Sequence, residues 1–241
     1  MSSIWIRTSL LWMCIFFSGC RLDSAHLGEA PGWVDDLHIK ELPPPLAAQT
    51  CCLAAREWER QGQLVEAMKC YEEARKLDPK VYGAVEKLAA LSDKTGEPEK
   101  ADKLYQEAVR ARPQDAKLRY EVALFHYRND HLSEAEHHLQ ETVRLAPDHR
   151  EAWEHLGKTL ARRSRFEESL VAFQKVYPEP EAKLKLGLAL HEVGREKEGR
   201  EFLREAIKEE PMLAKSVKKL LPAELLKPTS GNEEIVPVRF K

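Results

Sequence analysis

Residues 62–79, GQLVEAMKCYEEARKLDP, return 34 residues later as residues 96–113, GEPEKADKLYQEAVRARP. Both stretches open with Gly, have Ala five residues on and Tyr nine residues on, and close with Pro. The small residue recurs at the same interval through most of the chain, as Ala67, Ala101, Ala135 and Ser169. Self-similarity at this period is typical of solenoids. The sequence therefore predicts one helical module repeated in tandem.

Other features follow the same register. The turn position is occupied by residues that tolerate a break between helices, Gly62, Gly96, Asp130 and Ser164. A bulky apolar residue recurs in each second helix, as Tyr71, Tyr105, Leu139 and Phe173, and three units close with Pro79, Pro113 and Pro147. Gly194 and Gly199 follow Ser164 and Ser169 by only 30 residues. The connector at residues 177–180 is therefore four residues short of the period.

Small residues on both helices of each unit predict close helix packing. The first helices supply Ala55, Ala89, Ala123, Gly157 and Gly187, which face the row of Ala67, Ala101, Ala135, Ser169 and Gly199 on the second helices. No single hairpin buries such a face alone, so the units are expected to stack. Residues 212–221, with Leu213, Val217, Leu220 and Leu221 at helical spacing, are expected to form a capping helix.

These residues resemble the tetratricopeptide repeat (TPR) family, whose units are helix–turn–helix hairpins of this length. Trp153, Leu156, Gly157 and Phe173 stand where the family has large, large, small and aromatic residues. The resemblance implies an all-α, right-handed solenoid of antiparallel helix hairpins that acts as a noncatalytic scaffold and binds a protein or peptide. Five repeats are expected over residues 48–213, at about 48–81, 82–115, 116–149, 150–179 and 180–213.

The N-terminus has the pattern of an export signal. Arg7 precedes an apolar run over residues 10–17, which ends in Phe17-Ser18-Gly19-Cys20 and is short for a membrane-spanning helix. The ending resembles a bacterial lipobox, which implies a signal peptide at 1–19 and a lipid on Cys20. Arg21 resembles the residue that permits sorting to the outer membrane, so an envelope protein facing the periplasm is expected. An uncleaved anchor and an ordinary signal peptide, which would give a soluble periplasmic adaptor, stay open.

The flanking segments and the charge limit the remaining possibilities. Residues 20–47 contain Pro and Gly without a helical period and are expected to be a tether, and residues 222–241 a flexible tail. The formal charge of −2 gives no basic field, so nucleic acid is not an expected partner. The length outside the repeats leaves no room for a second ordinary domain.

Three cysteines, Cys51, Cys52 and Cys70, remain beyond the signal and Cys20. Cys51 is predicted on the buried face of the first helix and Cys70 on the second helix, so antiparallel packing could bring them together. Export would permit a disulfide, but buried free cysteine is also a common core residue. Whether Cys51 or Cys52 pairs with Cys70 stays open.

Histidines gather in the third unit, as His126, His131, His137 and His138. A metal-dependent protein or hydrolase that uses this cluster is the alternative from another functional class, because His and the nearby Glu134 and Glu141 are metal-ligand types. However, adjacent residues on a helix diverge by about 100°, and His126 falls in the core row. The sequence therefore favours no metal, cofactor or catalytic residue.

The binding surface is expected on the first helices, which line the groove in the family. A second apolar stripe in the third unit, at i, i+4 and i+7, has no evident core duty and resembles an interface. It either binds a partner or packs on the neighbouring unit. The predicted groove residues, stripe included, are Arg56, Arg60, Lys94, Tyr120, Leu124, Tyr127, Arg128, Lys158, Arg162, Leu184, Leu188 and His191.

Overall fold

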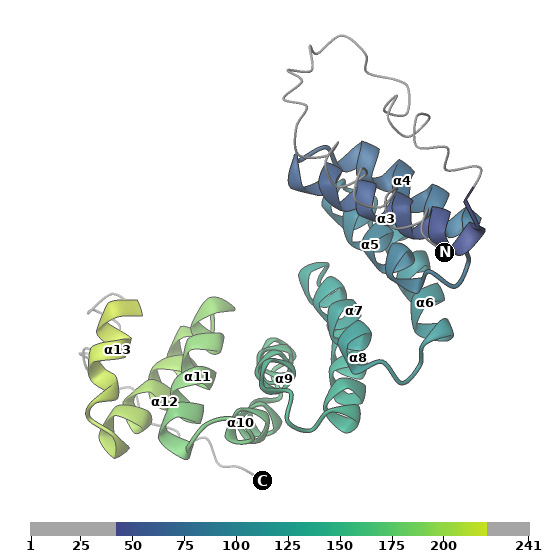
Figure 1. Ribbon diagram of the computed structural model, residues 1–241. Helices are drawn as coiled ribbons and strands as arrows, with labels where there is room; N and C mark the ends of the chain where they lie inside the picture. Colours follow the sequence, from purple (N-terminus) through teal and green to yellow (C-terminus); the bar gives the residue numbers. More distant parts are fainter. Residues whose placement is uncertain (1–41, 221–241) are drawn as a thin grey trace, which may run out of the picture.

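The computed structural model describes residues 42–220, and this part of the chain is a curved stack of helix hairpins (Figure 1). The predicted all-α solenoid is confirmed. In chain order the helices are α3 (Pro44–Arg60), α4 (Leu64–Leu77), α5 (Tyr82–Lys94), α6 (Pro98–Ala111), α7 (Ala116–Arg128), α8 (Leu132–Leu145), α9 (Arg150–Arg162), α10 (Phe166–Gln174), α11 (Glu179–Glu192), α12 (Glu196–Glu209) and α13 (Leu213–Leu220). The predicted signal peptide, Cys20 and the C-terminal tail lie outside the described residues.

The turn inside each hairpin uses a left-handed backbone. The positive φ angles are 77° at Gly62, 82° at Gly96, 62° at Asp130, 61° at Ser164 and 76° at Gly194. Gly adopts this conformation readily, and Asp and Ser carry short polar side chains that adopt it at a modest cost. The predicted turn register is therefore confirmed in all five hairpins of the described chain.

The two helices of each hairpin approach closely at the small residues. Ala67, Ala101, Ala135 and Ser169 are fully buried. A Cβ atom added to Gly157 would stand 2.8 Å from the ring of Phe173, and one added to Gly187 would stand 2.9 Å from the backbone oxygen of Gly199. Backbone contact of this kind fixes the distance between the paired helices, as the small-residue pattern predicts.

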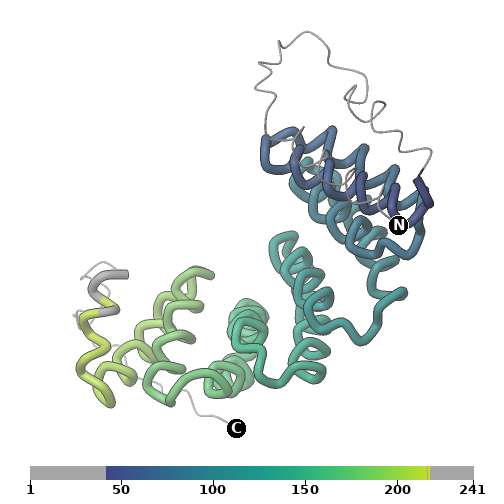
Figure 2. The backbone as a smooth tube through the Cα atoms, in the orientation of Figure 1, coloured from purple at the N-terminus to yellow at the C-terminus, as the bar shows by residue number. Residues whose placement is uncertain are grey.

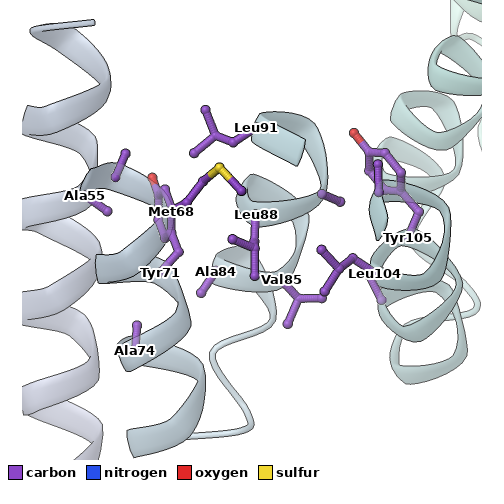
Figure 3. Close-up of a cluster of buried hydrophobic side chains, with 14 of the residues drawn as sticks. Ala55, Met68, Tyr71, Ala74, Ala84, Val85, Leu88, Leu91, Leu104 and Tyr105 are labelled. Carbon is purple, nitrogen blue, oxygen red and sulfur yellow. The ribbon is translucent and has the colours of Figure 1, made fainter. Parts of the chain in front are cut away.

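The core continues from one hairpin into the next. Met68 and Tyr71 of α4 pack beside Leu88 and Leu91 of α5, and Leu104 of α6 extends the same cluster (Figure 3). The hydroxyl of Tyr71 donates a hydrogen bond to the Glu59 carboxylate, which satisfies its polar end at the edge of the core. Later clusters repeat the arrangement through α13.

The first helix starts earlier than the sequence indicates. It begins at Pro44, inside the segment predicted as a tether, with Pro43 at the N-cap. Proline is tolerated in the first helical turn because the N–H groups there lack helical partners in any case. Ala47 and Ala48 on this added turn are buried.

The two ends of the array differ from a regular unit. The helix α10 has 9 residues where α8 and α12 have 14, which accounts for the shortened connector before α11. At the C-terminal end Leu213 and Val217 of α13 pack on Leu184 and Leu203. Within residues 42–220, no helix combines the length and apolar character needed to cross a membrane.

The cysteines of the first hairpin are free thiols. Cys51 is buried, and Cys52 and Cys70 are half-buried. Burial raises the pKa of Cys70 to about 11, and Cys51 nearby contributes to this shift. No disulfide links Cys70 to Cys51 or Cys52 in this structure.

Candidate partner-binding groove

The first helices of the hairpins line the inner side of the curve. Figure 2 shows the chain bending, and in Figure 1 α5, α7, α9 and α11 lie inside α6, α8, α10 and α12. Neighbouring first helices also contact each other, in the pairs α5–α7, α7–α9 and α9–α11. The inner surface is therefore a continuous row of helices, which is what a groove for an extended ligand requires.

Polar contacts near the turns join each first helix to the next. Arg128 donates to the Asp93 carboxylate at 2.8 Å, and Arg162 donates to the Asp130 carboxylate at 2.7 Å. Arg195 then donates to the Ser164 hydroxyl at 2.7 Å. Because these contacts recur about one period apart, they hold the first helices at a regular spacing. Two predicted groove residues, Arg128 and Arg162, thus serve the array itself.

The aromatic stripe of α7 packs on the next unit. The Tyr120 hydroxyl lies 3.1 Å from Nδ1 of His155, and its ring centroid is 4.6 Å from that of His149. The Arg162 guanidinium lies 4.8 Å from the centroid of the Tyr127 ring and also donates to the Tyr127 carbonyl oxygen. Tyr120 and Tyr127 are half-buried by these contacts. Of the two functions considered for these two residues, the structure shows packing against α9.

Burial sets the ionisation of this cluster. The pKa of His155 is lowered, chiefly because the ring is removed from water, although its hydrogen bond to the Glu151 backbone favours the charged form. The pKa of Tyr127 is raised by burial, and Arg162 partly opposes the shift. At neutral pH His155 is therefore uncharged, and Arg162 carries the positive charge of the cluster.

The remaining predicted groove residues fall into three groups. Arg56 and Lys94 are exposed and Lys158 is half-buried, and none of the three has an ion pair with another described residue. Leu124, Leu188 and His191 are half-buried, and Arg60 pairs with Glu57 on its own helix. Leu184 was predicted to face the groove, and this is wrong: the residue is buried against Leu203 and α13. The short α10 shifts the phase of α11, and the capping helix then covers Leu184.

Sequence reasoning missed His149 and His155 as neighbours of the stripe. His155 follows Tyr120 by 35 residues, one period plus one, so it lies on the next first helix almost level with Tyr120. Trp153 on the same helix donates its Nε1 hydrogen to the Pro147 carbonyl at 2.9 Å. The repeat period carried this signal, because residues one period apart lie side by side in a solenoid.

The histidines of the third hairpin do not form a metal centre. His126 and His138 have parallel rings, with centroids 5.6 Å apart and planes 7° apart, so their nitrogen lone pairs do not converge. In the part of the chain that the structure describes, no group of three or more His, Cys, Asp or Glu residues is placed to hold a metal ion. The metal-dependent alternative thus has no built site there.

Paired helices in tandem, small residues at their contacts and a helical inner surface define a helix-hairpin repeat protein. A family model described as the Cilia and flagella-associated protein 70 middle TPR-like domain matches residues 85–208, and the Tetratricopeptide repeat model matches residues 52–116. The chain belongs to the tetratricopeptide repeat family.

Related proteins agree with this fold. Tetratricopeptide repeat protein 7A from Homo sapiens is 29% identical over 120 residues, which cover 50% of this chain and 14% of that protein. The crystal structure of YrrB, described as a TPR protein with an unusual peptide-binding site, superposes with a TM-score of 0.57 at 21% identity, covering 79% of this chain and 100% of that one. MamA gives a TM-score of 0.53 at 21% identity, with 67% and 96% coverage. These structures are similar in fold.

Proposed function

We propose that this protein is a noncatalytic scaffold that binds a peptide or protein in its inner groove while a lipid on Cys20 holds it in a bacterial envelope. TPR membership supports the scaffold class, and the described YrrB site gives a precedent for peptide binding in a structure of this fold. The lipobox-like ending at Cys20 supports the anchor.

The observation that carries the groove is the set of inner-surface residues without an internal duty. Arg56, Lys94 and Lys158 come from three successive hairpins and make no ion pair with other described residues. Leu124 lies between the two packed tyrosines and is half-buried, so it offers an apolar contact at mid-groove. Tyr120 and Tyr127 support this surface from beneath, because α9 fixes their positions.

A charge-reversal pull-down tests the groove. The tagged full chain and its Lys94→Glu/Lys158→Glu variant are used as baits in detergent-solubilised membranes, with Lys103→Glu/Lys208→Glu as the matched control on the exposed second helices α6 and α12. A partner retained by wild type and the control but lost by the groove variant supports the proposal. A partner retained equally by all three contradicts it.

Lipid attachment is tested separately. Wild type is expected to partition into detergent and to carry a mass added at Cys20, while Cys20→Ala is expected to lose both. Recovery of the wild-type chain in the aqueous phase after cleavage would favour the soluble periplasmic adaptor instead. The tether and the outer membrane remain parts of the proposal, with Arg21 as the sorting feature.

A further inference from the structure

We propose that the contact between the second and third hairpins is an acid-sensitive joint: the neutral, stacked rings of His126 and His138 keep it closed, and their protonation opens it to water. The inference concerns the curvature of the solenoid and does not depend on any partner or on the lipid.

The joint lies where packing between hairpins is thinnest. α6 and α7 contact each other less than the corresponding pairs α4–α5, α8–α9 and α10–α11. In Figure 1 the helices α3–α6 and the helices α7–α13 form two blocks that meet at this point. A cavity of about 460 Å³ opens between α6 and α8, with Val122 and His126 of α7 contributing to its lining. On the groove side Asp93 still receives hydrogen bonds from Arg128 and Asn129, which gives the joint a pivot.

Two imidazoles form the closed contact. The His126 side chain is more than nine-tenths buried, and its ring is parallel to that of His138 at 5.6 Å. Nδ1 of each ring is buried and has no hydrogen-bond partner in the structure. A neutral imidazole tolerates such surroundings at a modest cost, whereas an imidazolium there loses hydration without gaining a partner for that nitrogen.

The surrounding charges do not reverse this preference. The charged and titratable groups that face the pair are Asp102 and Arg110 of α6, Arg119 of α7, His131 before α8, and Glu134 and His137 of α8. Asp102, with an oxygen 3.7 Å from Nε2 of His126, and Glu134 favour protonation. Desolvation nevertheless lowers the pKa of His126, and desolvation with neighbouring His126 and His137 lowers that of His138 to about 4.

The sign of the pH effect follows from linkage. A histidine with a lowered pKa in the closed state binds fewer protons than the same ring in water, where its pKa is about 6.5. The closed state is thus fully favoured above pH 6.5 and loses its advantage as the pH falls from 6.5 towards 4. With a closed-state pKa of about 4, His138 alone raises the ratio of open to closed protein up to about twentyfold between pH 7 and pH 5.

Opening is expected to occur at the cavity. Separating α6 from α8 hydrates both rings without breaking the Asp93 contacts on the opposite side. The block α3–α6 would then turn relative to α7–α13, which changes the curve of the groove. A titration of two side chains would thus alter the shape of a surface that spans several hairpins.

Hydrogen exchange of the full chain at pH 7 and pH 5, with times corrected for the intrinsic rate, tests the joint. Amides of α6–α8 are expected to lose about tenfold protection at pH 5 while α11 and α12 change little. His138→Leu should abolish this loss, and His137→Leu, at the exposed neighbouring position, should keep it. Equal loss in wild type and His138→Leu, or no loss in wild type, would overturn the proposal.

A second readout covers the case in which His138→Leu does not fold. Histidine ring protons of the wild-type chain are then titrated by NMR, with His137→Leu used for assignment. Midpoints for His126 and His138 below 6, together with the loss of protection in α6–α8, support the joint. A midpoint at or above 6.5 for either ring overturns it.

Discussion

At the residue scale, the distance between the two helices of a hairpin depends on single hydrogen atoms. Gly157 lies against the Phe173 ring, and its carbonyl oxygen accepts a 2.7 Å hydrogen bond from the Ser169 hydroxyl. Both partners are fully buried, so neither has free space to move into. A side chain at this glycine must therefore push the helices apart or displace the ring.

Gly157→Ala is expected to destabilise the protein by about 1–3 kcal/mol, because its methyl group overpacks the contact with Phe173. Gly83→Ala is the matched control, since a Cβ there meets nothing within 4 Å and α5 gains helix propensity. Urea unfolding of both variants measures the difference. Equal stability for the two variants would mean that the helices are not in close contact at Gly157.

Sequence patterns predicted the small contact residues well because one geometric demand repeats in every unit. Ala67, Ala101, Ala135 and Ser169 are all buried, and each turn residue has a positive φ. The groove residues were less predictable, because a charged or aromatic side chain on the inner face can serve either a partner or the next repeat. Arg128, Arg162, Tyr120 and Tyr127 serve the next repeat through contacts that sequence spacing alone does not distinguish.

At the element scale, adjacent first helices are held by a few polar and aromatic contacts as well as by core packing. Between α7 and α9, Arg162 combines a cation–π contact with Tyr127, a hydrogen bond to the Tyr127 carbonyl and an ion pair with Asp130. The side chain is only about a quarter exposed, so these contacts are partly shielded from solvent.

Arg162→Ala is expected to cost about 1–2 kcal/mol, because it removes the cation–π contact and two hydrogen bonds. Arg144→Ala on α8 removes an exposed pair with Glu141 and should cost less than about 0.5 kcal/mol. Thermal unfolding of the two variants compares them directly. A smaller loss for Arg162→Ala than for Arg144→Ala would refute a role for this residue in joining α7 to α9.

At this scale the fourth hairpin shows where a regular period fails as a guide. The short α10 was indicated by the missing four residues, but the resulting burial of Leu184 was not. Its burial depends on how α11 turns towards α13, and that is a packing outcome several residues away. Likewise, the start of α3 at Pro44 depends on the burial of Ala47 and Ala48 against the first hairpin.

At the scale of the whole molecule, a solenoid needs an end that faces water. α13 provides it at the C-terminal side, with the fully buried Val217 against the last hairpin and the exposed Lys215 turned away. The contact closes a core cluster that includes Leu184, Leu203 and Ala206. Loss of this helix would leave that apolar surface uncovered.

Val217→Asp is expected to lower stability by about 2–4 kcal/mol, because it buries a carboxylate without a partner and removes apolar packing. Lys215→Asp, two residues away on the same helix and exposed, should change stability by less than about 0.5 kcal/mol. Circular dichroism melts measure both. If Val217→Asp melts like wild type, α13 does not cap the array.

The account's central claim, that the inner face of the curve binds the partner, is tested most directly by photocrosslinking. A photoreactive residue is placed at Leu124 on α7 or at Val171, an exposed position on the second helix α10, and the tagged chain is irradiated in intact cells. The account predicts one partner crosslinked from position 124 and absent from position 171. The same partner captured from position 171 alone would contradict it.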